Sequence, residues 1–198
     1  MTFKPPYWYQ DNIKFPDEEI KILKSEIDGL REQKFAKGNQ HISTFLLEKY
    51  ERPESKYLDL YKKIVEDITK SVGIYYKITY DVSFWTQLYD KGMSHNPHHH
   101  AMINPDWEST ISWVHFLDVP DQKCFRFTDT KGNILIPDEQ SSGDIICFPS
   151  WVWHEVVPLE TDYLRLVTAG NIGFTSHDEL YSYSGTPLNS SGIKKHYT

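Results

Sequence analysis

Four of the nine histidines fall in one short segment, His95-Asn96-Pro97-His98-His99-His100. In a β-strand, residues two apart point to the same face, so we expect His98 and His100 to project together and His99 to point the other way. Two imidazoles on one strand face form a bidentate site for a first-row transition metal ion. The alternative is a polar surface loop with incidental histidines, and the segment alone leaves both interpretations open.

A later segment offers a third histidine for the same ion. Residues 143–154, GDIICFPSWVWH, read as a tight turn, an apolar strand, a short break and then His154. If this strand returns beside the first, His154 can reach the metal held by His98 and His100. The sequence therefore allows one metal site built from two distant segments.

Arg165 interrupts an otherwise apolar run, YLRLVTA at 163–169, and its neighbours on the same strand face are apolar. A guanidinium that faces inward needs an anionic partner. That partner could be a protein carboxylate, Glu160 or Asp162, at a strand edge. It could instead be the carboxylate of a ligand, held in a bidentate fork.

The chain changes character near residue 73. Before it, apolar residues at helical spacing predict one helix from Asp17 to about Lys34 and another over about 53–72. After it, the period shortens to two, and the predicted strands are 74–80, 83–89, 97–101, 110–117, 123–128, 133–136, 144–148, 154–157 and 163–173. Many short strands predict a double-sheet architecture.

We therefore predict a single, mainly β domain of the jelly-roll type, a cupin-like double-stranded β-helix. An N-terminal helical layer over 1–73 would support a β core over 74–181. The last residues, 182–198, are rich in Ser, Gly, Asn and Pro and are expected to form a flexible tail.

Length and composition limit the function classes. The 198 residues suit one domain, and the net charge of −7 disfavours a non-specific nucleic-acid binder, which would carry a basic surplus. The N-terminus has no apolar signal sequence, and no run reaches the ~18 apolar residues of a membrane span. Cys124 and Cys147 are expected to be buried free thiols. These features predict an intracellular, cytoplasmic protein without a membrane partner, whose metal site uses His and carboxylate ligands.

Several of these pieces recur in a fixed order. The order is a Trp-containing strand (Trp85), a Gly (Gly92), His-x-His (His98-His99-His100), a core strand (111–117), Gly-Asp (Gly143-Asp144), Phe-Pro-Ser-Trp (148–151), a His (His154), an Arg (Arg165) and then Asn171. With these residues the chain resembles the Fe(II)/2-oxoglutarate-dependent oxygenases. It looks closest to the prolyl-4-hydroxylase-like branch and its compact members from phages and marine bacteria. The resemblance covers about residues 83–174.

The resemblance implies Fe(II) as the metal, 2-oxoglutarate and O₂ as cosubstrates, and oxidation of a substrate C–H bond with release of succinate and CO₂. It implies His98 and His154 as metal ligands. Arg165 matches the residue that binds the distal carboxylate of 2-oxoglutarate. Tyr89, nine residues before His98, matches a Tyr placed against the cosubstrate, and Asn171 is a further candidate for the same pocket.

Two positions depart from the family pattern. The third metal ligand is usually an Asp or Glu two residues after the first His, and here that position is His100. Asp106, in the following loop, is the alternative, but it lies outside the usual strand position, so His100 is preferred. Phe116 stands where related hydroxylases often have a Tyr that hydrogen-bonds the distal carboxylate. Arg165 would therefore bind that carboxylate with less help.

Two other functions stay open at this point. A cupin-like three-His dioxygenase that does not use 2-oxoglutarate would explain the histidines but leave Arg165 unexplained. A non-catalytic jelly-roll module would leave both features unexplained. The substrate could be a protein side chain, a nucleotide or a small metabolite, and the sequence does not indicate the oligomeric state.

Overall fold

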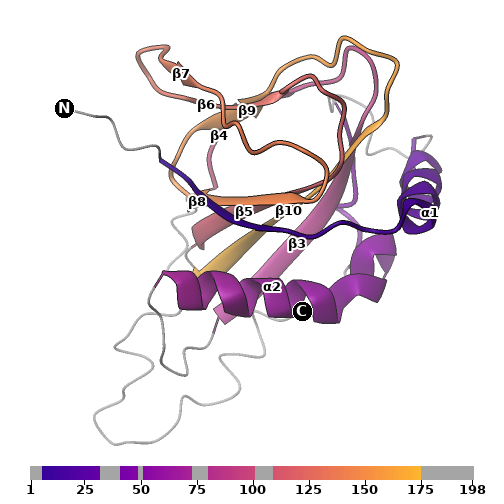
Figure 1. Cartoon of the computed structure of the whole chain (residues 1–198), viewed down its shortest axis with the longest axis horizontal. Helices are drawn as coiled ribbons and strands as arrows, with labels where there is room; N and C mark the ends of the chain where they lie inside the picture. Colours follow the sequence, from indigo (N-terminus) through magenta and orange to yellow (C-terminus); the bar gives the residue numbers. More distant parts are fainter. Residues whose placement is uncertain (1–5, 32–40, 49–50, 73–79, 101–108, 175–198) are drawn as a thin grey trace, which may run out of the picture.

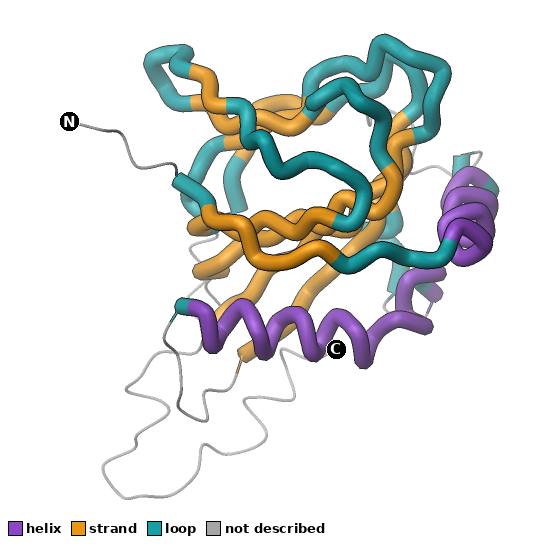
Figure 2. Tube along the Cα trace, in the orientation of Figure 1, coloured by secondary structure: helices purple, strands orange, loops and turns teal. Residues whose placement is uncertain are grey.

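The structure is a computed structural model, which describes residues 6–31, 41–48, 51–72, 80–100 and 109–174. Several sequence predictions fall wholly or partly outside this part of the chain: Asp106, the tail over 182–198, all but the last residue of the strand 74–80, the end of the first helix at Lys34 and the last residue of the strand 97–101. The described residues form two antiparallel β-sheets that lie one over the other, with helices against the larger sheet (Figures 1 and 2). This is the mainly β fold with a helical layer that the sequence predicts.

Six strands make up the larger sheet. In spatial order they are β1 (Trp8–Asn12), β8 (Asp144–Pro149), β5 (Ser109–Asp118), β10 (Arg165–Phe174), β3 (Tyr80–Tyr89) and β2 (Ile42–Ser43). The central strand β10 pairs with β3 along its whole length, and Arg165 lies opposite Tyr89. Neighbouring strands are distant in the sequence, as expected of a jelly roll.

Four short strands make up the smaller sheet, in the order β4 (His95–His98), β9 (His154–Val156), β6 (Phe125–Thr128) and β7 (Ile134–Leu135). The pairing of β4 with β9 sets His98 directly opposite His154. The predicted return of the His154 segment beside the first histidine segment is therefore what the structure shows.

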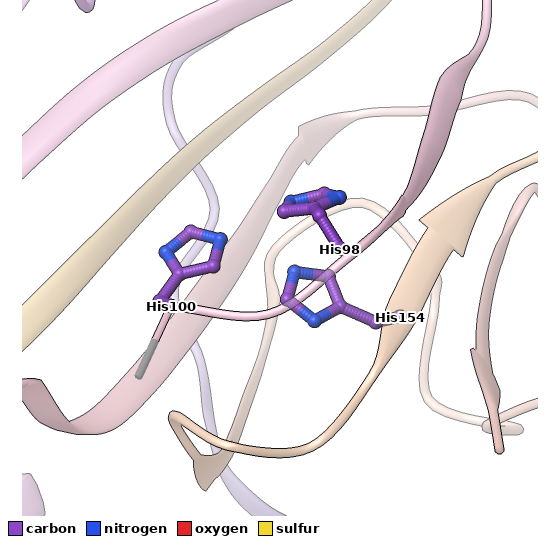
Figure 3. A group of neighbouring side chains, drawn as sticks. All are labelled: His98, His100 and His154. Carbon is purple, nitrogen blue, oxygen red and sulfur yellow. The ribbon is translucent and has the colours of Figure 1, made fainter. Parts of the chain in front are cut away.

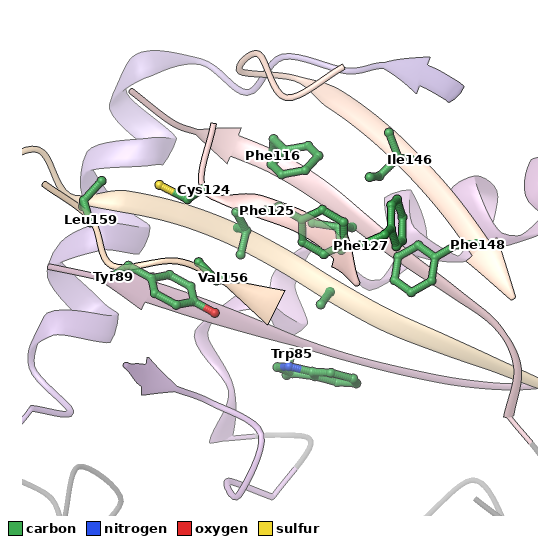
Figure 4. Packing of buried hydrophobic residues seen from close by; sticks show 13 residues of the cluster. Trp85, Tyr89, Phe116, Cys124, Phe125, Phe127, Ile146, Phe148, Val156 and Leu159 are labelled. Atoms are coloured by element: carbon green, nitrogen blue, oxygen red, sulfur yellow. The ribbon is translucent and has the colours of Figure 1, made fainter. Parts of the chain in front are cut away.

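The space between the two sheets is filled by a buried cluster that includes Phe116, Phe125, Phe127 and Phe148 (Figure 4). Phe125 and Phe127 of β6 meet edge to face at 5.1 Å between ring centroids, and Phe127 meets Phe148 of β8 at the same distance. Such aromatic pairs contribute about 0.5–1.5 kcal/mol each beyond the burial of their area. A few large rings thus hold the sheets apart at a fixed spacing.

The helices cover the other face and one end of the larger sheet. Helix α2 (Leu58–Ser71), preceded by a 3₁₀ turn η3 (Pro53–Tyr57), packs Tyr61, Val65 and Ile68 on the strands of the larger sheet. Helix α1 (Asp17–Asp28) buries Leu23 and Ile27 in a separate cluster. Both helices were expected, although α1 ends earlier than predicted.

Some features of this layer differ from expectation. Helix α2 ends at Ser71, one residue before the predicted end, and Val72 beyond it is 40% exposed. The region before residue 73 also supplies β1 and β2 to the larger sheet. None of the helices in the described part of the chain is long and apolar enough to cross a membrane.

Strand β10 requires a glycine where it passes Trp113. A Cβ atom built on Gly170 would lie 2.4 Å from Cζ2 of that indole, far inside van der Waals contact. The indole of Trp113 is fully buried and cannot move aside. Gly170 therefore lets β10 lie close to β5 immediately before Asn171.

Candidate metal centre

Three histidines converge beside the pair of strands β4 and β9 (Figure 3). His98 ends β4, His154 begins β9, and His100 follows β4 by two residues. One ring nitrogen from each lies within 4.8 Å of the others. Small side-chain rotations would bring all three nitrogens to the roughly 2.1 Å that a metal–imidazole bond requires.

Hydrogen bonds fix which nitrogen of each ring faces the others. Nδ1 of His98 lies 2.7 Å from the carbonyl oxygen of Asn96, and Nδ1 of His154 lies 3.0 Å from that of Val152. Nδ1 of His100 lies 3.0 Å from the side-chain oxygen Oδ1 of Asn171. A neutral imidazole that donates from Nδ1 keeps a lone pair on Nε2, so three Nε2 atoms are left for a metal.

Burial keeps these rings uncharged. Burial, together with the neighbouring imidazoles, lowers the pKa of His100 to about 4 and the pKa of His154 well below its ordinary value. The pKa of His98 is lowered by the same desolvation. Neutral imidazole is the form that binds a metal ion, so the centre is ready for a first-row metal at pH 7.

The predicted anion-binding residue lies in the same interior. Arg165 is 2% exposed, and neither Nη1 nor Nη2 has a hydrogen-bond partner among the described residues. Its guanidinium carbon lies 4.8 Å from the ring centroid of Tyr89 and 5.8 Å from that of Phe116. Asp162, a possible protein partner, pairs with Lys91 at 3.1 Å instead. Burial lowers the pKa of Arg165, but a guanidinium remains charged.

One cavity joins the histidines to Arg165. Its empty space, counted out to the mouth, is about 400 Å³. Trp85, Phe125 and Phe148 supply much of its apolar wall. No carboxylate stands among the described residues that line it. The cavity thus offers three neutral metal ligands and one cation with two free N–H donor groups, an arrangement suited to an anion.

Tyr89 and Asn171 are not among the residues that line this cavity. Tyr89 lies beneath the guanidinium of Arg165 and donates its hydroxyl to Oε1 of Gln87, at 3.2 Å. Asn171 contacts His100 instead of pointing into the space beside Arg165. Their direct contact with a cosubstrate therefore stays a prediction.

Sequence reasoning missed two polar residues of this interior. Gln87 lines the cavity, and its Nε2 lies 3.1 Å from Nε2 of His41. The ring of His41 also contacts that of His95 in a tilted arrangement, at 4.4 Å between ring centroids. The alternation of β3 could have indicated Gln87, since Trp85 and Gln87 are two residues apart. Nothing in the sequence around His41 predicted its position.

The remaining histidines of this region have simpler roles. His115 is fully buried, and its Nε2 lies 2.8 Å from the carbonyl oxygen of Ile13, as expected of a satisfied strand histidine. His99 is exposed and meets Trp153 edge to face. Asp106, the alternative third ligand, lies outside the described residues. His100 as the third ligand remains a prediction that this geometry favours.

Comparison with known proteins gives a result for the fold only. No protein-family model matches the sequence, and no curated protein does. Among solved structures, a Pseudomonas putida prolyl-4-hydroxylase superposes with a TM-score of 0.61 at 19% identity, over 86% of this chain and 94% of that one. The viral collagen prolyl hydroxylase of Paramecium Bursaria Chlorella virus-1, solved with 2-oxoglutarate, gives 0.59 at 15%, over 87% and 97%.

A third similar structure catalyses different chemistry. The epimerase SnoN, in complex with Fe³⁺, alpha ketoglutarate and nogalamycin RO, gives a TM-score of 0.60 at 14% identity, over 84% of this chain and 78% of that one. The chain therefore has the jelly-roll fold of the 2-oxoglutarate- and iron-dependent oxygenases. The predicted resemblance to that group, prolyl hydroxylases included, is confirmed for the fold.

Proposed function

We propose that this chain is a 2-oxoglutarate-dependent oxygenase that uses Fe(II). The observation that carries the proposal is a single cavity that contains both a three-histidine group and a buried, unpaired guanidinium. Leaving a buried charge without a partner costs several kcal/mol unless a ligand supplies the counter-ion. A dicarboxylate that also binds a metal answers both features at once.

The donor set fits the metal. Three neutral imidazoles from one side would hold Fe(II) through Nε2 of His98, His100 and His154 and leave the opposite positions open. When bound, Fe(II) with 2-oxoglutarate supplies the capacity to activate O₂ and oxidise a C–H bond, with succinate and CO₂ as co-products. The two Nη groups of Arg165 would bind the distal carboxylate of 2-oxoglutarate as a bidentate pair.

The apolar wall serves this chemistry by excluding water. Phe125 and Phe148 pack against His154, with ring centroids 5.5 and 4.8 Å away, and Trp85 stacks on His100 at 5.6 Å. A dry site strengthens the attraction between Arg165 and a carboxylate and protects a reactive centre from side reactions. These rings also hold the imidazoles in place.

We propose hydroxylation of a protein side chain or a small molecule as the reaction. The names of the similar structures cover collagen prolyl hydroxylation and nogalamycin epimerisation, so the fold is compatible with both substrate classes. A partner membrane or nucleic acid is not part of the proposal.

Turnover of 2-oxoglutarate to succinate tests the proposal directly. We expect succinate to form only with Fe(II) and O₂ present, and His154→Ala to abolish both metal binding and succinate formation. His99→Ala is the matched control, since His99 lies in the same segment but is exposed and outside the ligand group. Metal binding without any binding of 2-oxoglutarate would favour the three-His dioxygenase instead. Absence of metal binding would favour a non-catalytic jelly roll.

A further inference from the structure

The three candidate ligands are oriented in two different ways. His98 and His154 each bond, through Nδ1, to the carbonyl oxygen of the residue two positions before them. These contacts come with the local backbone and need no other element. His100 instead bonds to a side chain, Asn171, which is 71 residues away on β10. Its orientation therefore depends on a residue that can be replaced without changing the metal ligands.

The amide of Asn171 is itself held in place. Its Oδ1 lies 2.8 Å from the hydroxyl of Ser112, which faces Asn171 across the β5–β10 pair. The same hydroxyl lies 3.0 Å from that of Ser150, and the backbone carbonyl of Ser150 accepts the N–H of His100 at 2.8 Å. The four residues form a closed ring of hydrogen bonds that ties His100 to the larger sheet.

The direction of these bonds determines the tautomer of His100. An amide oxygen can only accept, so it takes the Nδ1–H of His100 and leaves the lone pair on Nε2. The same amide oxygen also accepts the hydroxyl of Ser112, so one oxygen joins His100 to β5. Both side chains are buried, with Asn171 7% and Ser112 1% exposed, so water does not compete easily for these bonds.

We propose that Asn171 is a positioning residue for His100, whose amide oxygen holds the imidazole with Nε2 toward the metal. This inference rests on the proposed metal centre. It also explains the departure at His100: a carboxylate ligand has two equivalent oxygens and needs no tautomer, whereas an imidazole ligand does. A histidine at that position therefore depends on a partner that fixes its tautomer, such as Asn171.

Cobalt(II) affinity, measured by competition with a chelator, tests the proposal without turnover. Asn171→Leu should weaken cobalt binding about 10- to 100-fold, the usual effect of losing a partner of a ligating histidine. Asn171→Asp should keep the affinity within a few-fold, because its carboxylate still accepts the Nδ1–H. Thr168→Val, on the same strand as Asn171, is the matched control. It removes the 2.9 Å hydrogen bond to Thr86 of β3 but touches no ligand, so cobalt affinity should not change.

A second comparison separates positioning from general damage. In a His100→Asp background the third ligand no longer needs orienting, so adding Asn171→Leu should cost little further affinity. The proposal is overturned if Asn171→Leu binds cobalt as the native chain does, or if its loss is equally large with Asp at position 100. If Asn171→Leu does not fold, Ser112→Ala, which frees the amide to turn, should weaken cobalt binding in the same direction, and unchanged binding would count against the proposal.

Failure of this inference can be told apart from failure of the proposed function. If His154→Ala leaves cobalt binding unchanged, there is no metal centre and both ideas fail. If His154→Ala abolishes binding while Asn171→Leu has no effect, the metal centre stands and only the role of Asn171 is wrong.

Discussion

Replacing Arg165 by Met should change the stability of the protein and its affinity for 2-oxoglutarate in opposite directions. Without a ligand, the guanidinium is buried with both Nη groups unpaired among the described residues, and its contacts with the rings of Tyr89 and Phe116 offset part of the lost hydration. Cation–π contacts of this kind return about 2 kcal/mol, whereas burial of the charge costs several. Met fills similar space without a charge. We therefore expect Arg165→Met to stabilise the ligand-free protein by about 1–3 kcal/mol.

In the same variant, the affinity for 2-oxoglutarate should fall. Two charged hydrogen bonds to a carboxylate are worth about 1.5–3 kcal/mol each, so their loss should weaken 2-oxoglutarate binding by about 3–6 kcal/mol. That corresponds to roughly a 10²- to 10⁴-fold rise in Kd. The metal ligands are unchanged, so cobalt affinity in the absence of 2-oxoglutarate should not fall.

Thermal unfolding and anaerobic titration measure the two effects. A gain of 1–3 kcal/mol raises Tm by about 2–10 °C for a chain of this size. Arg126→Met is the matched control, because Arg126 pairs with Glu155 at 2.8 Å and does not line the cavity. This variant should not raise Tm, and its 2-oxoglutarate binding should be unchanged. A fall in Tm for Arg165→Met would show that the guanidinium has a structural partner. Unchanged 2-oxoglutarate affinity would remove it from the cosubstrate site.

Two further predictions concern single buried residues. Phe116→Tyr adds a hydroxyl on a ring beside Arg165. The hydroxyl can donate one more hydrogen bond to the distal carboxylate, so titration should show 2-oxoglutarate binding about 3- to 10-fold tighter. Weaker binding would contradict the placement of that carboxylate beside Arg165. Burial lowers the pKa of His115 from 6.5 to about 4, so the unfolded chain binds a proton that the folded chain rejects, and stability falls as pH drops through this window. Urea unfolding of the metal-free protein at pH 7.5 and pH 5 measures how much free energy of unfolding is lost between these pH values. The loss should be about 2 kcal/mol smaller for His115→Leu than for the native chain. An equal loss in both would mean that His115 is not buried as a neutral ring.

The sequence predicted that His98, His100 and His154 would lie together, but not which contacts bring His100 to the other two. The strand-face argument assumed that His98 and His100 share one strand, but β4 ends at His98. His100 still joins the group because its backbone N–H bonds to the carbonyl of Ser150 and its ring bonds to Asn171. Those are contacts across the fold, which a local period cannot contain.

For Arg165, in contrast, the local sequence pattern was sufficient. Its apolar strand neighbours were enough to predict an inward guanidinium, because alternation in a strand fixes the face of each side chain. The resemblance placed Asn171 in the same pocket as Arg165, but the sequence did not indicate that its amide would bond to His100. That bond depends on the close approach of β10 to β5 at Gly170, which is visible only in three dimensions.

The packing between the sheets has a consequence for the size of the molecule that fits. The candidate metal ligands lie at the smaller sheet, whereas Arg165 belongs to the larger one. The rings of Phe125, Phe127 and Phe148 set how far apart these sheets lie (Figure 4). The spacing of the sheets would therefore set the distance between a metal ion held by the histidines and the guanidinium of Arg165, and so the length of the diacid that fits the proposed site. Trimming one of these rings should shift preference among four-, five- and six-carbon 2-oxo diacids, although the ring itself need touch neither end of the acid.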